Sequence, residues 1–194
     1  SDGTLKIRHE GASLVEALPY DVMISGHGGK GVSVLRLWRA SAPASFDMKS
    51  FTQGDYFAAM RGDNEAELIS KVLYPSDDHF EGKQLRLSQQ YFLVSASLQS
   101  IIKDHLKRNP SLDNLAEKAA IHINDTHPAL AVPELMRLLM DEYGFAWEKA
   151  WDITVNTIAY TNHTVMSEAL EKWSEDLVRM RLPRIYSILK EIDA

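Results

Sequence analysis

Cysteine is absent from this chain of 194 residues, which excludes disulfide bonds and thiolate metal ligands. Long hydrophobic runs are absent as well. The longest stretch without a charged residue, residues 87–102, is shorter than the ~20 residues of a membrane-spanning helix and contains several serines and glutamines. We therefore predict that no segment crosses a bilayer, and we expect a cytoplasmic protein.

The chain also lacks an excess of positive charge. It has 21 Lys and Arg against 27 Asp and Glu, a net charge of −6, and the two signs are interspersed. Binding to nucleic acid or to an anionic membrane requires Lys and Arg clustered on one face. We therefore expect neither partner. The hydrophobic share of 45% is ordinary for a globular protein and excludes a disordered chain.

The sequence contains no polar low-complexity segment that could be a linker between domains. Its length suits one domain or part of a larger one. We predict a single structural unit over residues 1–194. The first four residues, Ser-Asp-Gly-Thr, contain neither a starting Met nor an apolar signal region. We therefore expect the chain to be a piece of a longer protein.

The first part of the chain has the composition of β-strands. Apolar runs at residues 14–18 and 20–24 are separated by Pro19, and a third run follows at residues 32–38. The glycine-rich stretch between them, residues 26–31, could cradle a phosphate through backbone N–H groups. However, Lys30 is followed by Gly31 instead of Ser or Thr, and no helix follows. We predict a hairpin turn.

Helices follow. A short one is predicted at residues 46–51, a second from Asp55 to Val72, and a long, largely buried one at residues 83–107. Gly62 costs the second helix about 1 kcal/mol, so packing must hold it. That helix either faces the core or forms an exposed arm that packs on a partner.

The second half alternates strands and helices. Ser111 is expected to cap a short helix, and strands are expected at residues 119–124 and 157–160. Helices at residues 129–143 and 147–155 separate these strands, and two more helices, broken near Pro183, end the chain. This order indicates an α/β fold, in which a sheet of parallel strands is connected by crossover helices.

Polar residues follow both predicted strands of the second half. Asn124, Asp125 and His127 follow the first strand, and His163 and Thr164 follow the second. Ligands of open α/β sheets bind beyond the carboxyl ends of the strands, and these groups suit a neutral ligand with many hydroxyls, such as a sugar.

Two other interpretations of these residues remain open. Asp125 could merely cap the next helix, with His127 a structural histidine beside it. A metal site built from Asp125, His127 and His163 ranks lower, since no His-x-x-x-His spacing is present, and we expect no metal. The other histidines are expected at the surface or in turns: His9, His27, His79, His105 and His122.

Several long motifs resemble the glycogen, starch and maltodextrin phosphorylases, especially the bacterial glycogen phosphorylases. They are LRLW at residues 35–38, VLYPSDDHFEGKQLRLSQQYF at residues 72–92, IHINDTHPAL at residues 121–130, VPELMRLL at residues 132–139 and AYTNHTVMSEALEKW at residues 159–173. They occur in the family's order, and the resemblance covers about residues 14–192.

The resemblance implies part of the N-terminal, glucan-facing domain of a two-domain enzyme of the glycosyltransferase-B type. Such an enzyme removes terminal α-1,4-linked glucose from glycogen or maltodextrin with inorganic phosphate and releases glucose 1-phosphate. Its cofactor, pyridoxal 5'-phosphate, would be bound by the C-terminal domain, whose motifs are absent from this sequence. We therefore expect no cofactor in this segment and no activity of the segment alone. A non-catalytic α/β module for ligand binding or assembly is the alternative.

The resemblance also implies site residues. His163 would contribute its main-chain carbonyl to the glucose, beside Asp125 and Thr164 as further catalytic residues. The implied substrate-binding residues are Asn124, His127 and Glu168 near the strand ends, Asp77 and Asp78 on a gate loop, and Arg86. The helix matching residues 55–72 would form a symmetric homodimer contact through Tyr56, Phe57, Met60 and Asn64.

Some residues depart from the family pattern. Lys103 and Asp104 replace the arginine pair with which the muscle enzymes hold the phosphate of AMP, and an unpaired carboxylate repels that anion. We therefore expect no AMP site here. Asp78 and His79 replace Asn and Phe, so the contacts of the gate loop are expected to differ.

Overall fold

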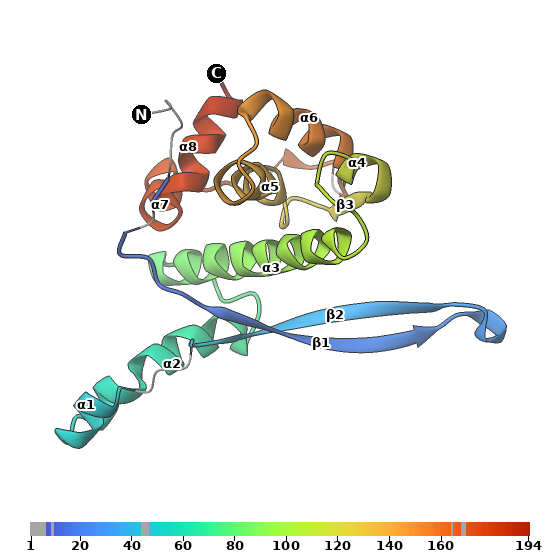
Figure 1. Ribbon diagram of the computed structural model, residues 1–194. Helices are drawn as coiled ribbons and strands as arrows, with labels where there is room; N and C mark the ends of the chain where they lie inside the picture. The colour runs from blue at the N-terminus through green and yellow to red at the C-terminus, as the bar shows by residue number, and fades with distance from the viewer. Residues whose placement is uncertain (1–6, 9, 44–46, 164, 168–169) are drawn as a thin grey trace. The chain divides into compact units, whose positions relative to one another are not determined.

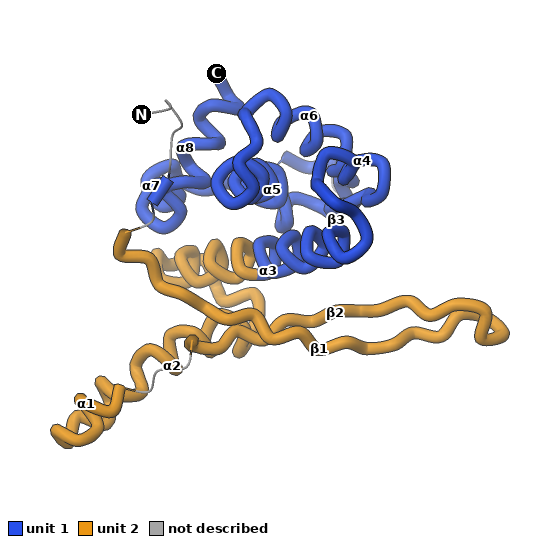
Figure 2. The backbone as a smooth tube through the Cα atoms, in the orientation of Figure 1, with its two compact units in different colours: residues 1–8, 93–194 blue, residues 9–92 orange. Residues whose placement is uncertain are grey.

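The structure is a computed structural model that describes residues 7–8, 10–43, 47–163, 165–167 and 170–194. The chain divides into two compact units, residues 1–8 with 93–194 and residues 9–92 (Figure 2). The boundary falls inside helix α3 (Phe80–Leu106). The assignment of the whole chain to one domain of a larger protein stays a prediction.

The unit of residues 9–92 contains an antiparallel hairpin of two ten-residue strands, β1 (Glu16–Ser25) and β2 (Val32–Ser41) (Figure 1). The predicted turn is confirmed: a short 3-10 turn, η1 (His27–Gly29), connects the strands, and Gly26 N–H donates to the carbonyl of Gly31 at 2.8 Å. Gly28 and Gly29 have positive φ angles of 66° and 69°, which side chains disfavour.

Pro19 does not divide the first strand, contrary to the sequence-based expectation. It lies within β1 opposite Trp38, and each strand of the described hairpin has an outer edge where a missing N–H costs nothing. One face of the hairpin carries six exposed apolar side chains, with Ser33 and Arg39 at its two ends: Leu18, Tyr20, Val22, Ile24, Leu35 and Leu37. On the other face, Arg36 donates two hydrogen bonds of 2.7 Å to Asp21, which lower the pKa of that carboxyl.

Two helices follow the hairpin. Asp47 caps α1 (Met48–Thr52), and Asp55 caps α2 (Tyr56–Lys71) by accepting a hydrogen bond of 3.0 Å from Ala58 N–H. The hydroxyl of Ser70 on α2 accepts a hydrogen bond of 2.9 Å from Ala40 N–H, which fastens the end of α2 to β2. Most of the remaining α2 surface is exposed, as an arm requires.

The other unit contains a parallel strand pair, β3 (Ile121–Asn124) and β4 (Ile158–Thr161). The chain passes from one strand to the other through α5 (Ala131–Arg137), the π-helical turn η2 (Leu138–Glu142) and α6 (Trp147–Thr157). The predicted parallel pair and its helical crossover are therefore confirmed. The fold is mixed α/β, because the other described sheet is the antiparallel hairpin.

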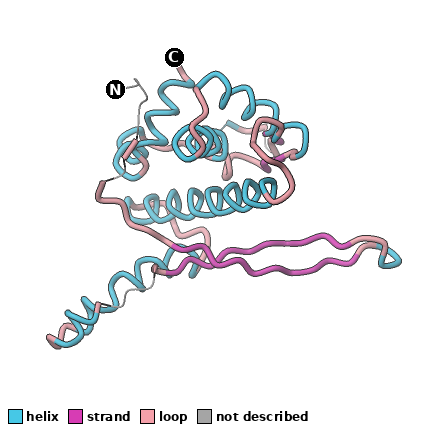
Figure 3. The backbone as a smooth tube through the Cα atoms, in the orientation of Figure 1, coloured by secondary structure: helices cyan, strands magenta, loops and turns pink. Residues whose placement is uncertain are grey.

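The remaining helices of this unit are α4 (Leu115–Lys118), α7 (Glu175–Arg181) and α8 (Pro183–Ile192) (Figure 3). The core lies among α3, α5, η2, α6 and α8, and its fully buried members include Ile102, Leu135, Leu139, Ile153 and Ile188. Burial of such side chains contributes roughly 1.5–3 kcal/mol each.

Two local predictions for this unit are wrong. Ser111 caps no helix, because α4 begins at Leu115. The hydroxyl of Ser111 instead donates to the carboxylate of Asp113 at 2.9 Å. His105 is not a surface residue. Its side chain is buried, and Nε2 lies 3.0 Å from the carbonyl of Ser111 and 3.1 Å from Oδ1 of Asn114, so the ring pins the loop after α3.

Candidate functional site

The carboxyl ends of β3 and β4 lie together, as expected for parallel strands. Asn124 is opposite Thr161 in the register, and the N–H of Asp125 continues the pairing by donating to the carbonyl of Thr161 at 2.8 Å. Asp125 adopts the left-handed region, φ 68°, and its carboxylate accepts a hydrogen bond of 2.8 Å from Thr126 N–H. The carboxylate therefore shapes the turn that leaves β3.

Polar side chains cover one face of the strand pair. Nε2 of His163 is paired with Oδ1 of Asn124, and Nε2 of His122 is paired with Oγ1 of Thr161. The structure thus brings together Asn124, Asp125 and His163 from segments almost forty residues apart. His127 is half-buried in the turn between β3 and α5, and Thr164 and Glu168 lie outside the described residues.

No group of three or more His, Asp or Glu side chains in the described part of the chain could hold a metal ion. The interpretation of Asp125 as a helix cap is wrong: α5 begins at Ala131 after Leu130 without a side-chain cap, and the carboxylate of Asp125 instead accepts from Thr126 N–H, five residues before the helix. One carboxylate oxygen, Oδ1, makes that bond.

The opposite face of the strand pair borders an apolar cleft of about 430 Å³. It is lined mainly by Ile123, Ile158 and Tyr160 of the strands and by Trp151, Thr154 and Val155 of α6. The hydroxyl of Thr154 is buried and, within the described structure, has no hydrogen-bond partner. Sequence reasoning missed this cleft, although residues 151, 154 and 155 have the spacing of one helix face.

The predicted gate-loop residues belong to the unit of residues 9–92. Asp77 lies 3.5 Å from the guanidinium of Arg86, which also stacks 5.5 Å from the ring centroid of Tyr74. Oγ of Ser76 donates to Asp78 at 2.8 Å. Arg86 is therefore occupied by its own loop, which holds the segment before α3 in place.

Helix α2 exposes the apolar residues that were predicted to form a dimer contact. Phe57 is 92% exposed, Tyr56 and Met60 are also exposed, and Asn64 is exposed on the same helix. An isolated exposed Phe is ordinary, but three neighbouring large apolar side chains on one helix mark an interaction surface.

The model of the carbohydrate phosphorylase family matches residues 1–194. The chain belongs to this family. It is 53% identical over 191 residues to the glycogen phosphorylase of Bacillus subtilis (strain 168). The matched region is 98% of this chain and 23% of that protein. It is 49% identical over 188 residues to the muscle form of glycogen phosphorylase from Homo sapiens. This match covers 93% of this chain and 22% of that protein. The chain thus spans less than a quarter of the length of these relatives.

The family assignment confirms the resemblance seen in the motifs at both strand ends. The glycogen phosphorylase of Synechocystis sp. is 48% identical over 191 residues, which again covers 98% of this chain. No helix among the described residues is long and apolar enough to cross a membrane.

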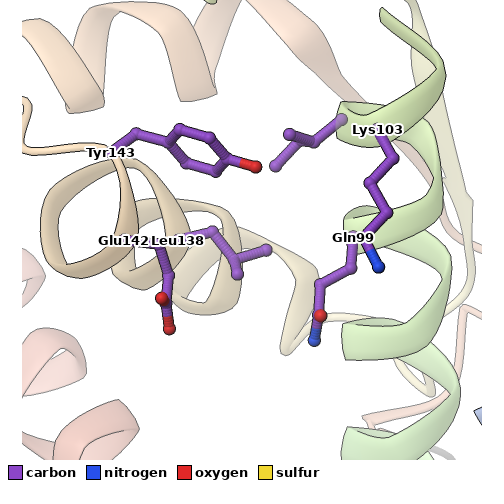
Figure 4. A pocket seen from close by; sticks show the side chains of 6 residues that line it. Gln99, Lys103, Leu138, Glu142 and Tyr143 are labelled. Atoms are coloured by element: carbon purple, nitrogen blue, oxygen red, sulfur yellow. The ribbon is translucent and has the colours of Figure 1, made fainter. Parts of the chain in front are cut away.

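The two residues that replace the arginine pair of the muscle enzymes lie at the end of α3. Lys103 lines a recess of about 150 Å³ together with Gln99, while Leu138, Glu142 and Tyr143 form the other side (Figure 4). Asp104 accepts a bond of 2.6 Å from Lys107. The carboxylate of Asp104 is thus paired, unlike the unpaired carboxylate expected from the sequence. The recess itself is lined by the ammonium of Lys103 and the carboxylate of Glu142, which do not favour a dianionic phosphate.

Gly82, in the first turn of α3, lets the backbone of the preceding loop approach the helix closely. A Cβ at this position would lie 1.8 Å from the carbonyl oxygen of Ser76 and 2.9 Å from the ring of His79. Gly82→Ala should therefore destabilise the fold by about 1–3 kcal/mol, because backbone must move to relieve the clash. Thermal unfolding measures the effect.

Gly62→Ala is the matched control for this prediction. Gly62 is also inside a helix, but nothing lies within 4 Å of its hypothetical Cβ, so alanine should stabilise the fold by up to about 1 kcal/mol. Equal effects of the two substitutions would show that the loop does not press on Gly82.

Proposed function

We propose that the complete protein carrying this chain is an α-1,4-glucan phosphorylase, which cleaves terminal glucose from glycogen or maltodextrin with inorganic phosphate to give glucose 1-phosphate. The observation that carries the proposal is the convergence of Asn124, Asp125 and His163 at the carboxyl ends of β3 and β4, within the two motifs of the family.

In this reaction the bond between C1 of the terminal glucose and the glycosidic oxygen breaks, a bond from C1 to phosphate oxygen forms, and the departing oxygen takes a proton. The main-chain carbonyl of His163 would accept a hydrogen bond from the glucosyl unit. The carboxylate of Asp125 would add negative potential where positive charge develops on the sugar ring. His127, Thr164 and Glu168 would line the same pocket. Asp77, Asp78 and Arg86 would be the substrate-binding residues of the gate loop.

Pyridoxal 5'-phosphate, the cofactor implied by the family, does not fit the described residues. A lysine that forms a Schiff base requires a desolvated site, and every lysine in the described part of the chain is exposed. We therefore place the cofactor, whose phosphate would supply acid–base chemistry, on another part of the complete protein.

The direct test measures glucose 1-phosphate released by the complete protein from maltoheptaose and phosphate. Release that depends on phosphate supports the proposal. Binding of maltoheptaose without any release, in protein loaded with pyridoxal phosphate, would instead favour the non-catalytic binding module. A location in the cytoplasm is part of the same proposal.

We also propose that the complete protein forms a symmetric homodimer through α2. Phe57→Asp combined with Met60→Asp should convert the dimer to monomer, because two carboxylates in an apolar contact lose their hydration. Sedimentation velocity measures the change. Met180→Asp is the control, because Met180 is similarly exposed but lies on α7. A double variant that remains dimeric would reject this interface.

AMP should not activate the complete protein. Asp104 carries negative charge at one of the two positions where the muscle enzymes have arginine, and Lys103 alone offers a single ammonium in place of two forked guanidiniums. Initial rates of phosphorolysis with and without AMP decide the point. Several-fold activation would show that another site binds the nucleotide phosphate.

A further inference from the structure

The polar face of the β3–β4 pair contains two histidines, each held by a side chain of the neighbouring strand. His122 on β3 is paired with Thr161 on β4, and His163, two residues beyond β4, is paired with Asn124 at the end of β3. His122 and Asn124 are two positions apart on β3, so their side chains lie on one face, and Thr161 and His163 meet them there. The second pair is the one nearest the proposed glucosyl site.

The pairing orients the imidazole of His163. Oδ1 of Asn124 is an amide carbonyl oxygen and can only accept a hydrogen bond, so Nε2 of His163 donates in this pair. Because Asn124 Oδ1 is engaged with the ring, that oxygen does not serve a sugar hydroxyl along the same direction.

The pairing also restrains the backbone of His163. β4 ends at Thr161, whose carbonyl accepts the N–H of Asp125 at 2.8 Å, and this is the last main-chain link between the two segments that the described structure contains. Beyond that link, the ring of His163 ties its segment to β3 through the side chain of Asn124. Rotation of the segment would swing the carbonyl of His163 away from its place.

We propose that Asn124 is a positioning residue, which holds the imidazole of His163 and thereby fixes the main-chain carbonyl of His163 toward the glucosyl unit. This inference rests on the proposed function. It assigns Asn124 a role through His163, in place of the direct substrate contact expected from the sequence.

Asn124→Leu in the complete protein should lower kcat for phosphorolysis of maltoheptaose about 10–100-fold, because small displacements of a contact group cost that much. The KM for phosphate should stay within about twofold. Asn124→Asp keeps an accepting oxygen against Nε2 and should recover most of the lost kcat. Thr161→Val removes the partner of His122 in the same strand pair and should leave kcat within about twofold.

A double-mutant cycle separates positioning from direct contact. Adding Asn124→Leu to His163→Ala should lower kcat by less than about twofold further, since the ring that Asn124 holds is already gone. The proposal is overturned if the losses of kcat in Asn124→Leu and His163→Ala multiply in the double variant. It is also overturned if Asn124→Leu leaves kcat unchanged, or if Asn124→Asp is as slow as Asn124→Leu. If Asn124→Leu has a lowered melting temperature, the cycle is repeated with Asn124→Ala, which removes the amide oxygen without adding bulk.

The activity of the unmodified complete protein distinguishes the failure of the proposed function from the failure of the positioning role. If the unmodified complete protein releases no glucose 1-phosphate, the proposed function fails. If it does release the product and the cycle is multiplicative, only the positioning role of Asn124 fails.

Discussion

Replacing Arg137 with methionine should lower the free energy of unfolding of this chain by about 3–5 kcal/mol. The carboxylate of Glu134 is 0% exposed, and the guanidinium of Arg137 donates two hydrogen bonds to it, at 2.8 and 3.0 Å. The hydroxyl of Ser95 on α3 donates a third at 2.6 Å. Without the arginine, the charge of Glu134 stays buried with its main cationic partner removed. Urea denaturation monitored by circular dichroism measures the loss.

Arg179→Met is the matched control. Arg179 and Asp176 form an ion pair with the same three-residue spacing, at 2.6 Å, but both side chains are exposed to solvent, so the substitution should cost less than about 1 kcal/mol. Adding Glu134→Leu to Arg137→Met should recover part of the stability, because it removes the buried charge. If the double variant is less stable than Arg137→Met alone, the buried charge is not the cause of the loss.

The 194-residue chain by itself should release no measurable glucose 1-phosphate from maltoheptaose and phosphate, even with added pyridoxal phosphate. The glucan, the phosphate and the cofactor phosphate must be held together, and positioning with electrostatic stabilisation supplies most of the rate of such reactions. The described lysines offer no buried amine for the cofactor, and the chain spans less than a quarter of its relatives.

The measurement compares equal concentrations of the chain and the complete protein in a coupled assay for glucose 1-phosphate. Maltose should also bind the chain weakly, because each hydrogen bond at an open site contributes roughly 0.5–1.5 kcal/mol before ordering costs. Turnover by the chain at a rate near that of the complete protein would contradict the division of labour proposed for the two parts.

The periodic elements were predictable because a repeated spacing of apolar residues records one buried face. The long helix was predicted at residues 83–107 and observed from Phe80 to Leu106, and the strand predicted at residues 119–124 is Ile121–Asn124. The meeting of Asn124 with His163 was predictable in outline, since parallel strands end at one edge.

Partners of single side chains were not predictable, because they depend on residues distant in sequence. His105 is buried against the loop at Ser111 and Asn114, yet it stands in a stretch rich in charged residues, 103–108, which is typical of an exposed helix end. The link from Ser95 to Glu134 joins helices thirty-nine residues apart and leaves no periodic signal. The pairing of Asn124 with His163 is of the same kind, because strand alternation gives a face but no partner.

The β1–β2 hairpin has a consequence for how the protein is made in the cell. Both of its strands are edge strands, because the described sheet contains only these two, and exposed apolar side chains such as Val22 and Leu35 lie beside those edges. Such ribbons add further strands readily, and Pro19 blocks this at only one position. On the ribosome, the hairpin is complete once residue 41 has emerged, long before β3 is synthesised. A nascent chain therefore exposes these two edges and their apolar side chains to solvent throughout that interval.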